Sequence, residues 1–222
     1  MKLKNIFLIF LFISIFDNAC ASVFTENADL IEYKYRHPGY LGVTCGYGAT
    51  TWGYLVPQDK NEAMNLSTPT RVSENGTLWG LYGGYELNHS FAFEASYMHY
   101  PIAKVYFDQA SLFTLENNLG GFVTHTQAIS FAGKFMIVIP RNINFRPYSS
   151  VGIAGIHRDD FMANSWKVTP KFGVGLSYLL TDHMMMELGI DYLAGDGVSE
   201  LNPAESFVPF LYSGFARLAM RL

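Results

Sequence analysis

The sequence predicts an all-β chain: an eight-stranded antiparallel up-and-down transmembrane β-barrel with short periplasmic turns and long extracellular loops. First, apolar side chains recur at every second position in eight segments, which is the period of extended backbone. Second, the connections between these segments alternate between short and long. Third, the 222-residue chain is 50% hydrophobic and only 15% charged, against about 25% charged residues in an ordinary soluble domain. Its longest apolar run, residues 6–16, is far shorter than the roughly 20 residues of a membrane-spanning helix.

The N-terminal residues 1–21 have the order of elements found in a secretory signal peptide. Lys2 and Lys4 precede the apolar run, and an Ala-x-Ala site ends at Ala21. Cys20 raises the alternative of a lipoprotein signal, but Asp17 stands where that signal has leucine. We therefore expect cleavage before Ser22, a short periplasmic segment over 22–38, and a single barrel domain over 39–222.

The mature chain would keep 13 basic and 18 acidic residues, a net charge of −5. It would also keep one cysteine, Cys45, so no internal disulfide can form even in an oxidising compartment. Mild acidity without a basic cluster argues against nucleic-acid binding.

The first four predicted strands carry bulky residues at alternate positions. Segment 40–49 alternates Leu, Val, Cys and Tyr with Gly and Thr, and segment 78–87 alternates Trp, Leu and Tyr with Gly, Tyr and Glu. Segment 91–99 alternates Phe, Ala and Tyr with Ala, Glu, Ser and Met. Segment 128–139 alternates Ile and Phe with Ala, Ser, Lys and Met.

The last four predicted strands repeat this pattern. Segment 145–156 alternates Phe, Pro, Val and Ile with Arg, Tyr, Ser and Gly, and segment 171–180 alternates Phe, Val, Leu and Tyr with Gly and Ser. Segment 184–193 alternates Met, Leu, Ile and Tyr with Met, Glu, Gly and Asp. Segment 211–222 alternates Tyr, Leu and Met with Ser, Phe and Arg, and it is the eighth strand.

The connections between the predicted strands alternate in length. Residues 88–90, 140–144 and 181–183 form short ones, and the long, polar, loop-like ones lie around 50–77, 100–126, 157–166 and 194–207. Strict alternation is typical of an up-and-down sheet whose two ends face different compartments.

The two faces of these strands are inverted relative to a soluble barrel. A soluble barrel packs its large apolar groups inside and spreads charges outside, whereas here the bulky apolar face fits the exterior and the small polar set fits a narrow interior. That arrangement suits a closed barrel dissolved in lipid.

Charged residues on the inward face should pair, because an unpaired buried charge is very costly. Four acids and five bases make up this predicted ion network, which we expect to block the lumen. They are Glu86, Glu94, Glu187, Asp191, Lys134, Arg146, Lys171, Arg217 and Arg221.

Aromatic residues gather near the predicted strand ends, where rings at the two membrane interfaces would form girdles. The predicted girdle residues are Trp52, Trp79, Tyr97, Tyr100, Trp166, Tyr178, Tyr192 and Tyr212, with Tyr54 and Phe145 nearby.

Together, the signal peptide, the eight alternating strands and the terminal strand resemble the transmembrane domain of outer membrane protein A. The segments "PYSSVGIAGI" and "KFGVGLSYLLTD" look like the fifth and sixth strands of that family. The C-terminal "YSGFARLAMRL" is similar to the assembly signal read by the barrel-insertion machinery, although Leu222 replaces the usual Phe. The signal residues would be Tyr212, Gly214, Leu218, Met220 and Leu222.

The resemblance implies location in the outer membrane of a Gram-negative bacterium, with membrane lipids and the assembly machinery as partners. Short, barrel-only members of the family are linked to envelope integrity, adhesion and resistance to host defences. We expect such a non-enzymatic role here, with a possible host or surface ligand bound through the acidic long loops. A small pore is the first alternative.

A lipid A-modifying enzyme is the second alternative, because deacylases and palmitoyltransferases exist on such small barrels. A deacylase would need His, Ser and an acid converging near the outer leaflet. The candidates are His99, His125, His157, Ser130, Asp159 and Asp160. No His-x-Ser arrangement links them, and isolated histidines and solvated acidic loops do not predict a metal site. We therefore expect no catalytic residues, metal or cofactor.

Overall fold

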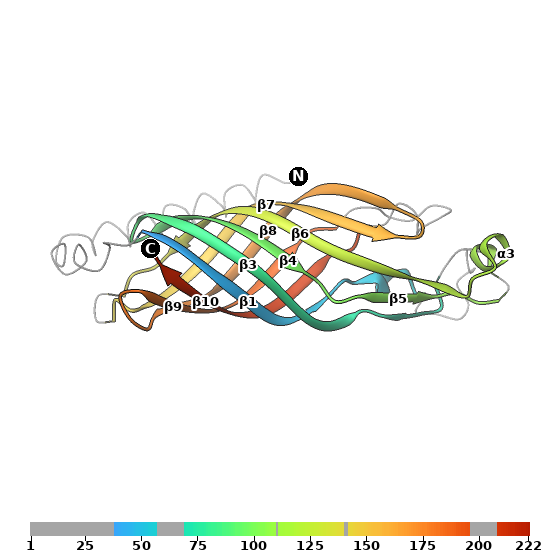
Figure 1. Ribbon diagram of the computed structural model, residues 1–222, viewed down its shortest axis with the longest axis horizontal. Coiled ribbons are helices and arrows are strands. Elements are labelled where there is room, and N and C mark those ends of the chain that lie inside the picture. The colour runs from blue at the N-terminus through green and yellow to red at the C-terminus, as the bar shows by residue number, and fades with distance from the viewer. Residues whose placement is uncertain (1–37, 57–68, 110, 140–141, 196–207) are drawn as a thin grey trace, which may run out of the picture.

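The computed structural model describes residues 38–56, 69–109, 111–139, 142–195 and 208–222. Eight antiparallel strands close into the predicted barrel, each paired with the next and the last paired with the first (Figure 1). They are β1 (Gly39–Ala49), β3 (Asn75–Asn88), β4 (Phe91–His99), β6 (Gly121–Met136), β7 (Phe145–Asp160), β8 (Asn164–Leu179), β9 (Met184–Leu193) and β10 (Leu211–Arg221). The predicted signal peptide lies outside the described residues, as does the N-terminal segment up to residue 37.

Four short elements form an extension at one end of the barrel. They are the 3₁₀ turn η1 (Trp52–Leu55), strands β2 (Arg71–Ser73) and β5 (Ala103–Tyr106), and helix α3 (Leu112–Asn117). β5 pairs with the first residues of β6, and β2 pairs with β5. β5 and α3 lie at the end of the barrel opposite the C-terminus (Figure 1). Neither described helix is long and apolar enough to span a membrane.

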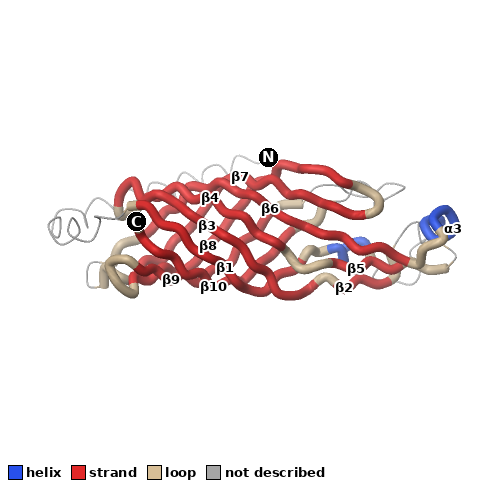
Figure 2. The backbone as a smooth tube through the Cα atoms, viewed as in Figure 1, coloured by secondary structure: helices blue, strands red, loops and turns tan. Residues whose placement is uncertain are grey.

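The extension corrects the prediction that 50–77 and 100–126 are wholly loop-like. The prediction for 157–166 was also wrong, because β7 and β8 continue as paired strands to Asp160 and from Asn164. Their turn is tight: the Asp160 carboxylate accepts backbone N–H bonds from Met162 and Ala163, both at 2.9 Å. The bulky apolar alternation fades where a strand leaves the lipid for water, so strands beyond the membrane have no such sequence signal. Figure 2 shows these extended strands beyond the body of the barrel.

The opposite end has the short turns that the sequence predicts at 88–90 and 181–183. Asn88 accepts a hydrogen bond from the Ser90 backbone N–H at 2.9 Å, which closes the first turn. The Arg221 backbone N–H donates to His183 at 2.8 Å, so the end of β10 lies beside the second turn. Residues 140 and 141 of the third turn lie outside the described residues.

His89, in the first short turn, provides a pH-dependent stability prediction. Burial lowers its pKa below the ordinary value, Arg146 lowers it further, and Glu86 opposes the shift. The folded chain therefore binds fewer protons at this site than the unfolded chain, so stability falls as pH drops through and below the ordinary histidine range of about 6.5. We expect urea unfolding of the refolded barrel to show this acid loss, and His89→Gln to reduce it. An identical pH profile in the variant would contradict the assignment.

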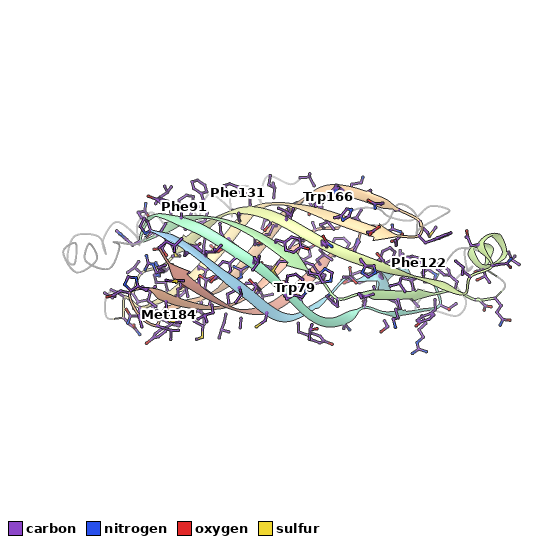
Figure 3. All side chains as sticks on the ribbon, viewed as in Figure 1. Trp79, Phe91, Phe122, Phe131, Trp166 and Met184 are labelled. Carbon is purple, nitrogen blue, oxygen red and sulfur yellow. The ribbon has the colours of Figure 1, made fainter. Side chains whose placement is uncertain are left out.

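The barrel wall has the predicted faces. Large apolar side chains are exposed on the outside of every barrel strand, for example Leu41, Leu81, Phe131, Ile153 and Leu188. Phe131, Trp79 and Trp166 project from the outer surface (Figure 3). The nine charged residues of the predicted ion network lie at the alternate positions and are buried inside.

Inward glycines make room for large aromatic side chains, of which Tyr82 and Tyr148 fall on the face that the alternation predicts to be inward. The interior holds Tyr40, Tyr82 and Tyr148, all buried. A Cβ added at Gly42 would lie 2.7 Å from the Tyr82 ring, and one at Gly175 would lie 2.6 Å from the Tyr148 ring. The inward glycines thus produce a filled interior rather than a wide one.

Gly46 and Gly214 give a matched test of this crowding, because they lie on neighbouring strands. A Cβ at Gly46 would strike the Gly214 carbonyl oxygen and lie 2.8 Å from the Phe215 Cα, whereas nothing lies within 4 Å of a Cβ at Gly214. We expect Gly46→Ala to lower the free energy of unfolding by about 1–3 kcal/mol, the range for overpacking. Gly214→Ala should change it by less than about 0.5 kcal/mol, as surface changes do. Equal effects in urea unfolding would contradict this account.

Candidate functional site

The barrel interior is the candidate site that the sequence singled out, and all nine predicted network residues are buried there. Near the end with the short turns, Glu86 on β3 accepts bonds from two arginines. Arg146 on β7 donates to Glu86 Oε1 at 2.9 Å, and Arg221 on β10 donates to Oε2 at 2.9 Å. One carboxylate therefore joins three strands, none of which is adjacent to another in the sheet.

The other six residues form a central cluster of three acids and three bases. Arg217 Nη1 lies 2.7 Å from Glu94 Oε1, and its Nη2 lies 3.5 Å from Asp191. Lys134 pairs with Glu94 at 3.2 Å and also with Glu187. Lys171 pairs with Asp191 at 3.0 Å. The formal charges of this cluster cancel.

Aromatic and hydroxyl groups complete the central cluster. The Lys134 ammonium lies 4.1 Å from the Tyr148 ring centroid, and the Arg217 guanidinium lies 4.7 Å from the Tyr82 ring centroid. Lys171 also donates to Ser130 at 3.1 Å. These contacts fill the cross-section with side chains, as expected for eight strands.

An apolar layer lies inside the strand ends on the extension side. It consists of Leu78, Met98, Tyr100, Ala128, Ala154, Ile156, Leu193, Val208 and Leu211. Most inward positions in the sequence are small or polar, so the alternation alone did not predict this layer. The lumen is thus closed by two different kinds of packing, ionic and apolar.

A third set of contacts lies at the base of the extension, and sequence reasoning missed it. Arg158 on β7 forms two hydrogen bonds with Asp160, at 2.6 Å and 3.1 Å, and its guanidinium lies 4.7 Å from the Trp52 ring centroid. Trp52 packs edge-on against Phe122 of β6, with ring centroids 5.7 Å apart. The alternation along β7 could have predicted that Arg158 is buried, because Arg158 lies on the same face of the strand as Arg146.

Glu74 forms a hydrogen bond with the residue of η1 that follows Trp52. Its Oε2 accepts the Gly53 backbone N–H at 2.8 Å. Burial raises the pKa of the Glu74 carboxyl, while the backbone N–H groups of Gly53 and Trp52 lower it. The η1 turn is therefore held from both sides, by Trp52 in the apolar cluster and by Glu74 at Gly53.

The predicted aromatic girdle needs two corrections. Trp52 is fully buried in the extension, and Tyr100 is buried in the interior apolar layer, so neither can touch lipid. The other six predicted girdle residues lie on the outward face of their strands: Trp79, Tyr97, Trp166, Tyr178, Tyr192 and Tyr212. Four of the predicted assembly-signal residues, Tyr212, Leu218, Met220 and Leu222, also have exposed side chains, and a side chain at Gly214 would meet open space.

The candidate hydrolase residues do not converge. Ser130 lies inside the barrel, where it contacts Ser96 and Lys171. His125 is exposed on the outward face of the same strand, and its cross-strand partner is Asp159. Because residues 125 and 130 have opposite parity on β6, no rotamer change brings the serine to the imidazole.

The outward histidines instead mark the upper limit of the apolar wall. Across the sheet His99 pairs with Gln127, and Gln127 pairs with His157. His157 stacks on Trp166 at 4.7 Å and exchanges a hydrogen bond with Asn164 at 3.1 Å. The described residues contain no group of three or more metal-ligating side chains.

A closed antiparallel barrel with an apolar exterior and a paired ionic interior is a transmembrane β-barrel. A sequence model of the OmpA-like transmembrane domain matches residues 39–213, and the chain belongs to that family of outer membrane β-barrels. A search of curated protein sequences returns no match.

Outer membrane and surface proteins are among the solved structures with a similar fold. Neisserial surface protein A is 12% identical at a TM-score of 0.51, over 83% of this chain and 97% of that one. AlkL in lipid bilayers is 16% identical at a TM-score of 0.51, over 85% and 92%. OprG from Pseudomonas aeruginosa is 11% identical at a TM-score of 0.50, over 85% and 99%. At these identities the likeness concerns the fold.

Proposed function

We propose that this protein is a non-enzymatic barrel of the Gram-negative outer membrane that supports envelope integrity or surface adhesion through its extracellular hairpins. The observation that carries this proposal is the contrast between the two parts of the molecule. The lumen is filled by paired charges and an apolar layer. The extension, by contrast, presents strands and a helix beyond the membrane.

The predicted signal peptide and the C-terminal strand support the proposed route to that location. Residues 1–21 would direct export and be removed. The outward residues of β10, from Tyr212 to Leu222, would be read by the assembly machinery. Membrane lipids would then surround the exposed apolar side chains of all eight barrel strands.

The chemistry of the site supports a role without catalysis. A nucleophile needs a base within hydrogen-bond reach. In the described residues Ser130 is buried against Lys171 and Ser96, on the opposite face from the histidines. The deacylase hypothesis would be supported if the protein showed activity on lipid A and His125→Ala abolished that activity.

Single-channel recording on the refolded protein in planar bilayers tests the closed lumen. We expect no sustained conductance, because the ionic and apolar layers leave no open path. A variant with Tyr82→Ala, Tyr148→Ala and Met98→Ala should raise conductance and so shows that the assay detects an opened barrel. Sustained conductance by the unaltered protein would overturn the closed-barrel proposal in favour of the pore.

The role of the hairpins needs a separate test in cells. One variant replaces residues 157–166 with a short turn, which removes the end of the β7–β8 hairpin, with Arg158 and Trp166, and keeps all nine residues of the ion network. Loss of binding to host cells or surfaces with unchanged detergent resistance would support adhesion. A second strain lacks the whole protein. Lowered detergent resistance in that strain, but not in the hairpin variant, would support envelope integrity. A null effect in both comparisons would contradict the proposal.

A further inference from the structure

We infer that the outward face of the β2–β5 sheet is a binding surface for the phosphate groups of outer-leaflet lipid headgroups, with Arg71 and Lys104 as the phosphate-binding residues. This inference depends on the outer membrane barrel and not on the role proposed for the hairpins.

Exposed positive charge is concentrated on the extension. Among the described residues, only three lysines and arginines are exposed, namely Arg71, Lys104 and Lys167. The remaining six are buried and face carboxylates inside the barrel or the extension. Two of the three exposed cations therefore lie on one small three-stranded sheet, on its outward face.

The strand pairing places Arg71 and Lys104 close together on that face. Ser73 pairs with Lys104, and Arg71 pairs with Tyr106, so Arg71 and Lys104 are diagonal neighbours. Such neighbours lie about 7–8 Å apart, near enough for the two side chains to converge on one phosphate or on two adjacent ones. The Arg71 guanidinium lies 5.8 Å from the Tyr106 ring centroid. Both side chains are exposed, and neither cation has a salt bridge with a described carboxylate.

The two cations lie close to the level of the lipid headgroups. β6 is continuous, so the outward face of the extension is the same face that meets lipid lower down. The polar boundary on β6 is Gln127, and Lys104 pairs with Val123, four residues further on. Four residues span about 13 Å of strand, or about 10 Å along the membrane normal at the usual barrel tilt. The headgroup region extends roughly 5–8 Å beyond the hydrocarbon core of the membrane. Long Lys and Arg side chains can bend back toward the membrane and reach this region.

The surrounding charges are compatible with this orientation. Ile102, a partly exposed apolar residue, lies on the membrane side of both cations, and Val123, also partly exposed, is the cross-strand partner of Lys104. Asp108 lies beyond Tyr106, on the far side from the membrane, and Asp159 faces His125 on the β7 side. The two cations thus lie between an apolar wall and the acidic outer parts of the extension. Phosphate is the anion that the membrane offers at this level, and Arg and Lys bind it by charge-assisted hydrogen bonds.

Calorimetric titration of the refolded protein in zwitterionic micelles tests the inference. The probes are short-chain phosphatidic acid, short-chain phosphatidylcholine and inorganic phosphate. Arg71→Gln and Lys104→Gln remove the proposed ligands, and Lys167→Gln is the matched control for loss of an exposed cation elsewhere. Heat-modifiable gel mobility checks that each variant is folded.

We expect phosphatidic acid to bind more tightly than the other two probes, and each substitution to weaken it about fivefold, the effect of one basic residue near an anionic membrane surface. The double variant should lose the preference over phosphatidylcholine, and Lys167→Gln should keep it. Three results would overturn the inference: no preference for phosphatidic acid, equal loss in Lys167→Gln, or tight binding of inorganic phosphate alone.

Discussion

Arg217→Leu is expected to lower the free energy of unfolding by about 3–5 kcal/mol, the range found when one member of a buried ion pair is removed. Arg217 is the only member of the central cluster in contact with all three of its acids, Glu94, Glu187 and Asp191. Leucine would leave three carboxylates facing two ammonium groups in a volume that excludes most water. Urea unfolding of the barrel refolded into vesicles, followed by tryptophan fluorescence, measures the loss.

A double variant distinguishes lost charge balance from lost packing. Arg217→Leu with Glu94→Gln has two acids and two bases, so it should recover part of the loss. With the Glu94→Gln single variant also measured, the departure from additivity gives the coupling free energy of the pair. Lys167→Gln, which removes an exposed lysine outside the proposed lipid-binding surface, should change stability by less than about 0.5 kcal/mol. A loss below about 1 kcal/mol in Arg217→Leu would mean that the ionic cluster contributes nothing beyond filling space.

The strict period of two made the interior predictable. Because side chains alternate across a closed wall, one correct parity for each strand places every charged residue inside or outside. The partners were not predictable in the same way. Glu86 forms ion pairs with Arg146 and Arg221 across the lumen. Such pairs depend on the stagger between strands, which no local sequence pattern encodes.

The parts of the chain beyond the membrane were predicted less well, for a physical reason. Lipid imposes an apolar outer face, and that face is the signal that sequence reasoning uses. Once β6 and β7 leave the lipid, their outward residues become His125, Asp159 and similar polar groups, so the strand looks like a loop. Tyr100 and Trp52 were wrongly assigned to the outward girdle. The apolar pattern marks where the wall ends, but it does not predict that the chain turns inward beyond that point.

Trp52→Ala is expected to weaken the extension by about 3–5 kcal/mol, the usual cost of truncating a buried tryptophan. The Trp52 side chain is fully buried and contacts three parts of the fold: Phe122 of β6, Arg158 of β7 and the apolar residues of β5. Alanine would leave a cavity among Ala103, Val105 and Phe122, and it would remove the ring beneath the Arg158 guanidinium. Hydrogen exchange at the β5 amides, measured in intact barrels, reports the free energy of local opening.

Tyr54→Ala is the matched control, since Tyr54 belongs to the same turn and is exposed. It should leave β5 exchange nearly unchanged. The barrel strands should also stay protected in Trp52→Ala, because Trp52 belongs to an apolar cluster separate from the interior apolar layer, and heat-modifiable mobility should persist. If exchange rises equally in β5 and in β9, the extension is not an independently opening unit. In that case Trp52 stabilises the barrel as a whole, and the wall and the extension unfold together.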